Sequence, residues 1–146
     1  MFSPSRDQAR RFFFETWRKY LERTPLIGLE GTALTVLLQH PEYHPMLADP
    51  EAYADRDYPP EGGETNPFLH LSMHLAIEEQ LSIDQPRGIK AHYQRITAQG
   101  AQAHDAQHRV MDCLAEVIWQ AQRHHTAFDG ALYLDCLKRQ ATAGTR

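Results

Sequence analysis

The fold is decided by one stretch of sequence, NPFLHLSMHLAIEEQLSI, at residues 66–83. Asn66 is a good helix-capping residue, and Pro67 follows at the first helical position, where its missing N–H breaks no bond. The apolar residues that come next recur every three or four positions, which is typical of one face of an α-helix. Stretches with the same period lie on both sides of it, and strand-like alternation is absent. The sequence therefore predicts an all-α protein.

Residues that start and stop helices divide the chain further. We expect five or six helices. The first begins at Ser3 or Ser5 and ends at Pro25, and the second spans about 29–39. The others span 66–83, Pro86 to Gly100, about 102–123, and a short stretch after Asp129. Between the second and third helices, residues 45–65 hold several prolines and glycines, which indicates a long loop with one short helical turn around 50–54. We expect a single helical domain over residues 1–146, with a tail that frays from about residue 141.

Composition excludes several classes of function. The chain has 146 residues, 42% of them hydrophobic, which is enough for a core, and its formal net charge is −4. Because it has no basic surplus, we expect no nucleic-acid binding. No stretch approaches the 18 apolar residues of a membrane span, so we expect no membrane partner. Two cysteines are too few for a disulfide framework, and the start lacks a signal peptide. We therefore expect a cytoplasmic protein with both thiols reduced.

Histidine spacing points to a metal site. The chain has nine histidines, and four of them form two H-x3-H motifs, His70 with His74 and His104 with His108. Residues four apart lie above one another on a helix, so each pair can grip one ion, and both pairs continue apolar stripes. If the helices alternate up and down, the two pairs lie at similar heights in a bundle. These four histidines are therefore the first candidate ligands.

Other residues near the two motifs can support such a site. Each motif is followed by an acid, Glu78 or Asp112, which can act as a further ligand or accept a hydrogen bond from an imidazole. His40 and His44 end the second predicted helix and can complete the site from the side. The expected cofactor is a divalent metal ion, iron or zinc, because imidazole and carboxylate donors suit both. The protein would then be a metal-binding helical bundle, and one form of this prediction is a non-haem iron or zinc enzyme that acts on an unknown small molecule.

Two alternatives remain open from the residues alone. The histidines can form a purely structural polar cluster in an interaction or adaptor protein, since buried polar groups are normally hydrogen-bonded. A homodimer through the aromatic face of the first helix would fit that alternative. Metal-free acid–base chemistry by histidine and glutamate is the second.

The loop at residues 45–65 is tethered at both ends beside the proposed site. Its prolines make it stiffer than a glycine- and serine-rich linker. We expect that it covers the histidines as a lid, with Tyr53 and Tyr58 closing over them. A plain surface connector is the alternative.

The third helix also carries a family resemblance. The block from Asn66 to Gln80 and the following Asp84-Gln85-Pro86-Arg87-Gly88 resemble the bacterial family catalogued as domain of unknown function 1841. The segments 40–44 and 104–122 fit that family too, and the likeness covers roughly residues 5–140. It implies a small bacterial cytoplasmic protein and implies no activity.

Overall fold

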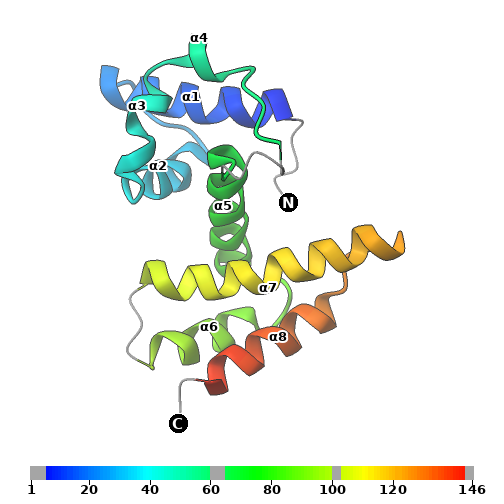
Figure 1. Ribbon diagram of the computed structural model, residues 1–146. Coiled ribbons are helices and arrows are strands. Elements are labelled where there is room, and N and C mark those ends of the chain that lie inside the picture. Colours follow the sequence, from blue (N-terminus) through cyan, green and yellow to red (C-terminus); the bar gives the residue numbers. More distant parts are fainter. Residues whose placement is uncertain (1–5, 60–64, 100–102, 144–146) are drawn as a thin grey trace. The chain divides into compact units, whose positions relative to one another are not determined.

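The computed structural model describes residues 6–59, 65–99 and 103–143, except for the side chains of residues 103, 104 and 143. Every regular element in these ranges is helical (Figure 1). The order is α1 (Arg6–Glu22), α2 (Glu30–Leu38), the 3-10 helix η1 (Pro41–Tyr43), α3 (His44–Leu47), α4 (Pro50–Tyr53), α5 (Pro67–Ile83), α6 (Ile89–Thr97), α7 (Ala103–His124) and α8 (Gly130–Ala143). None of these helices is long and apolar enough to cross a membrane.

The all-α prediction is confirmed, and the expected number of helices is too small. The described ranges hold eight α-helices, where the sequence predicted five or six. The extra ones are short: α3 and α4 span four residues each, too few for apolar periodicity to reveal them. The helical turn expected around 50–54 is confirmed by α4, and it interrupts the long loop. The expected caps Ser3 and Ser5 lie outside the described residues, as do residues 60–64 of the loop.

The chain divides into two compact units, Met1–Ala76 and Ile77–Arg146, and the boundary falls inside α5. The single domain expected over residues 1–146 stays a prediction. In the first unit, α1 contacts α2 and α3. Its core is formed by aromatic and aliphatic side chains that are almost completely buried: Phe13, Phe14, Trp17, Ala33, Val36, Leu37, Met46, Leu47, Phe68, Leu71 and Leu75.

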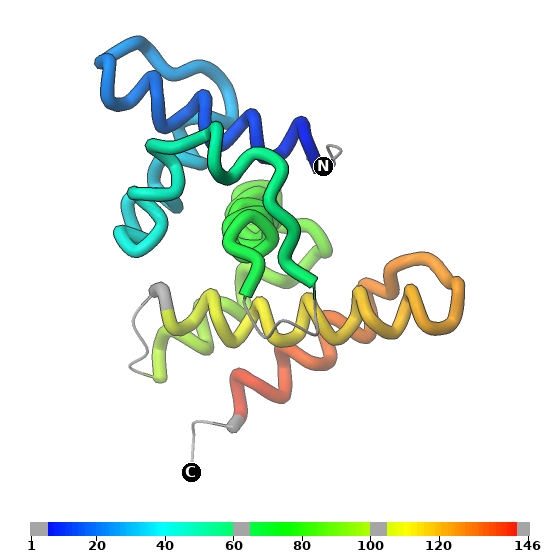
Figure 2. Tube along the Cα trace, turned by 45° about the horizontal axis from the view of Figure 1, so that its top comes forward, coloured from blue at the N-terminus to red at the C-terminus, as the bar shows by residue number. Residues whose placement is uncertain are grey.

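A buried arginine fixes the path of the chain after α4. Arg10 on α1 is 3% exposed. Its Nη1 donates to the carbonyls of Tyr53, Ala54 and Arg56 at 3.1, 3.1 and 2.7 Å, and its guanidinium lies 4.4 Å from the centre of the Phe68 ring. Figure 2 shows the segment after α4 running beside α1. The arginine thus donates to carbonyl oxygens that accept no hydrogen bond within a helix, and these bonds hold the segment against the core.

An ion pair with little solvent exposure joins α1 to the start of α2. Lys19 Nζ lies 2.9 and 3.0 Å from the carboxylate oxygens of Glu30, which also accepts a bond of 2.9 Å from the Ile27 amide. The amide of Ile27 is the main reason that the pKa of Glu30 is lowered, and the bond and charge of Lys19 add to it. Folding therefore favours the ionised form of this carboxyl.

We expect this carboxylate to make the first unit sensitive to acid. A carboxyl whose pKa is lower in the folded chain stabilises it fully above the unfolded pKa, roughly 4, and loses that contribution as the pH falls through the folded pKa. Glu30→Gln should lower the free energy of unfolding by about 1 kcal/mol at pH 7 and by less at pH 3. Urea unfolding at both pH values measures the difference. An equal loss at both would show that the charge of Glu30 is unimportant.

The second unit is a group of three packed helices. Figure 1 shows α7 alongside α8, with α6 next to them, in agreement with the contacts among these helices. Tyr133 of α8 is fully buried, and its hydroxyl donates to Gln80 Oε1 at 2.7 Å. Burial raises the pKa of Tyr133, so the phenol stays protonated. Asp129 caps α8 as predicted, because its carboxylate accepts from the amides of Ala131 and Leu132.

The cysteines differ from the sequence expectation of two reduced thiols. Cys113 of α7 and Cys136 of α8 form a disulfide, with their Cα atoms 5.7 Å apart. That distance lies within the normal range for disulfides, so the packing of α7 against α8 brings the two sulfurs together. The expectation was wrong because it rested on the small number of cysteines and on an expected reducing compartment, whereas one bridge needs only two cysteines on adjacent helices.

Candidate metal centre

Helix α5 places two histidines of the first unit on one face. Asn66 caps the helix as predicted, since its Oδ1 accepts from the amides of Phe68 and Leu69 at 3.0 and 3.2 Å. Four residues further, His70 and His74 lie one turn apart, with their Nε2 atoms separated by 3.2 Å. His74 is fully buried and His70 is half-buried. The H-x3-H motif thus produces the paired imidazoles that its helical spacing predicts.

His40 brings a third imidazole to the same place. It follows α2 at φ −127° and ψ 65°, just before Pro41, so the chain leaves the helix here. Its ring centre lies 4.7 Å from that of His74 and 5.2 Å from that of His70. His40 is 1% exposed, and its Nδ1 lies 2.8 Å from the Val36 carbonyl oxygen. Because a carbonyl only accepts, Nδ1 carries the hydrogen, and in the neutral ring Nε2 then keeps its lone pair.

The distances among these rings suit a small metal ion. The candidate ligand nitrogens of His40, His70 and His74 all lie within 4.8 Å of one another. Three nitrogens bound tetrahedrally at about 2.0–2.1 Å would be about 3.4 Å apart, so a small inward movement would be enough. The bond from His40 to Val36 resembles the outer contacts that usually orient metal-binding histidines. The three imidazoles therefore lie close enough to bind one ion together once the hydrogen between His70 and His74 is displaced.

The other predicted ligands have different surroundings. In the first unit, His44 stacks on Trp17 with ring centres 4.3 Å apart, and its Nε2 lies 2.8 Å from the Leu37 carbonyl oxygen. In the second unit, the side chain of Glu78 accepts a bond from the amide of Gln107, and Asp112 is exposed on α7. These contacts do not include the three clustered histidines.

The second H-x3-H motif lies on α7 in the second unit. His108 is half-buried there, and the side chain of His104 lies outside the described residues. A site that these two histidines share with the first unit stays a prediction.

Sequence reasoning missed Tyr43, the tyrosine beside the cluster. Its ring is parallel to that of His40, with centres 5.6 Å apart, and meets the edge of the His70 ring at 6.1 Å. Burial, followed by the charge of Glu42, raises the pKa of Tyr43. The one feature of the sequence that could have pointed to Tyr43 is its position three residues after His40. The tyrosines expected to form the lid have other contacts. Tyr58 packs on Phe68 with ring centres 6.5 Å apart, and the guanidinium of Arg56 lies 5.7 Å from the centre of the Tyr53 ring.

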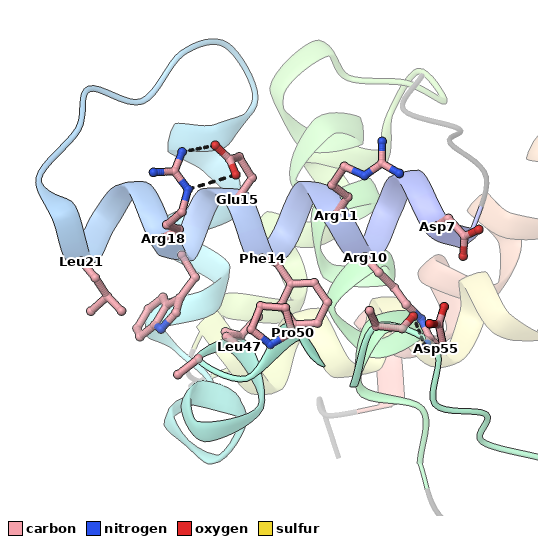
Figure 3. Close-up of a pocket in the computed structure, with 13 residues that line it drawn as sticks. Asp7, Arg10, Arg11, Phe14, Glu15, Arg18, Leu21, Leu47, Pro50 and Asp55 are labelled. Atoms are coloured by element: carbon pink, nitrogen blue, oxygen red, sulfur yellow. Dashed lines mark hydrogen bonds and ion pairs between the residues drawn. The ribbon is translucent and has the colours of Figure 1, made fainter. Parts of the chain in front are cut away.

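A separate groove of about 540 Å³ runs along α1 in the first unit. Figure 3 shows Phe14 of α1 close to Leu47 and Pro50, with Asp55 towards one end. None of the three clustered histidines lines it. This groove is thus distinct from the imidazole cluster.

Fold and site together define the class: an all-helical protein with a cluster of three mostly buried imidazoles. Comparison with known proteins then gives the family. Residues 5–139 match the family described as domain of unknown function 1841, and because this match covers most of the chain, the protein belongs to that family. No curated protein and no solved structure gives a significant match.

Proposed function

We propose that this protein binds one divalent transition-metal ion through His40, His70 and His74. The observation that carries the proposal is the hydrogen bond from His40 Nδ1 to the Val36 carbonyl, within a group of three close imidazoles. That bond selects the tautomer whose Nε2 can bind metal. Two of the three rings are almost fully buried, so the candidate ligand nitrogens are largely shielded from water.

The donor atoms favour zinc over iron. Iron(II) sites commonly combine two histidines with one carboxylate, whereas zinc is often held by three imidazoles. In the first unit, no described carboxylate joins His40, His70 and His74 in a cluster of candidate ligands. An enzymatic role would further require a position on the ion for a substrate. The repeat of the H-x3-H motif supports a contribution from His108, with His104 as the next candidate.

Metal analysis of untagged protein tests the proposal. After expression with added zinc and iron and extensive dialysis, we expect about one metal ion per chain, because three imidazoles hold zinc firmly. His70→Ala/His74→Ala should remove it, as measured by inductively coupled plasma mass spectrometry. A matched control, His124→Ala/His125→Ala, also removes two imidazoles, from residues exposed to solvent, and should keep the metal. The variant His108→Ala tests the fourth ligand separately.

The same geometry supports one competing function. His70 and His74 hydrogen-bond each other, and His40 bonds Val36, as a structural polar cluster in an adaptor protein would require. A homodimer through the first helix belongs to this alternative. It predicts substoichiometric metal in both the unchanged protein and the double variant, and a stable fold without metal.

A further inference from the structure

The imidazole cluster is less deeply buried on one side than on the other. His40 and His74 are 1% and 0% exposed, whereas His70 and the neighbouring Tyr43 are half-buried. From this difference we infer that Tyr43 is the gate of the site: its ring covers the solvent side of the cluster and sets the rate at which metal enters and leaves. This inference rests on the proposed function, because it assigns a gating role to a residue beside the same metal site.

Local structure explains why Tyr43 occupies this position. Pro41 begins η1, and the Tyr43 amide donates to the His40 carbonyl at 3.0 Å, which folds the chain back within one turn. The ring of Tyr43 therefore returns over His40, with only 5° between the two ring planes, and its edge contact with His70 is at 76°. One aromatic ring thus touches two of the three candidate ligands.

The ring, rather than the hydroxyl, provides this cover. Among the described residues the Tyr43 hydroxyl has no hydrogen-bond partner, so it does not orient a histidine. The flat apolar face limits the access of water and of competing ligands to the nitrogens behind it, and such shells control exchange at metal sites. Movement of this one side chain would open the solvent side without unfolding the helix that carries His70 and His74.

The test is the rate of zinc release from the full chain into excess EDTA, followed with a zinc-sensitive dye. Tyr43→Ala should release zinc about tenfold faster than the unchanged protein, an effect of the same order as the loss of affinity when a group that supports metal ligands is removed. Tyr43→Phe keeps the ring and should release zinc at the original rate. Tyr20→Ala, which removes a more exposed tyrosine of the same unit, is the matched control and should leave the rate unchanged.

The outcomes separate the gate from the metal site itself. If neither the unchanged protein nor any of the variants retains zinc, the proposed function fails. If zinc binds with full stoichiometry and Tyr43→Ala releases it at the original rate, only the gate is overturned. Equal acceleration in Tyr43→Phe and Tyr43→Ala would also overturn it, by assigning the effect to the hydroxyl. Should Tyr43→Ala fail to fold, Tyr43→Leu, which cannot lie flat on His40, should still release zinc at least about threefold faster.

Discussion

Reduction of the bridge between Cys113 and Cys136 should lower the free energy of unfolding of the second unit by about 3 kcal/mol. The two cysteines are 23 residues apart and join α7 to α8. Cutting the bridge frees the unfolded chain to sample many more conformations, so the unfolded state gains entropy. Guanidinium unfolding followed by circular dichroism, with and without a phosphine reductant, measures the loss. The reductant should act on the folded protein, because Cys136 is half-buried rather than fully buried.

A double variant controls for effects of the reductant elsewhere. Cys113→Ala/Cys136→Ala should show the lower stability under both conditions, with no further change on adding phosphine. Thiol titration under denaturing conditions gives the redox state directly. The bridge would be contradicted if the protein as isolated had two free thiols and if the reductant did not change its unfolding curve.

Much of the fold follows from local signals in the sequence. The boundaries of α5 and the cap of α8 were predictable because Asn66-Pro67 and Asp129 start helices by side-chain hydrogen bonds to nearby amides. The disulfide between Cys113 and Cys136 could not be predicted in this way, because the distance between two cysteines depends on how their helices pack. The short helix α3 was missed for a different reason, since four residues cannot show a period of 3.6, whereas the turn formed by α4 was expected at about 50–54.

The candidate site was predictable where one helix builds it. His70 and His74 meet because they are four residues apart on α5, and spacing alone shows this. His40 joins them through the path of the chain after α2, so the sequence placed it only among several supporting residues. Tyr43 was overlooked because its role depends on the turn of η1, which lies in a proline-rich segment. The acids Glu78 and Asp112 were plausible ligands by spacing; in the structure Glu78 accepts a bond from Gln107, and Asp112 is exposed.

Zinc should stabilise the first unit if the three histidines bind it, and should not change its free energy of unfolding if they form a structural cluster. An ion that binds only the folded chain adds about 4 kcal/mol to the free energy of unfolding at a free concentration one thousand times its dissociation constant. Urea unfolding in a zinc buffer and in EDTA measures this difference. In His40→Ala the zinc-dependent gain should largely disappear, because one of three ligands is gone. A structural cluster predicts the opposite pattern: His40→Ala would destabilise the protein equally with and without zinc, since only its bond to Val36 is lost. What decides between the two functions is therefore whether the destabilisation caused by His40→Ala depends on zinc, and not how large that destabilisation is.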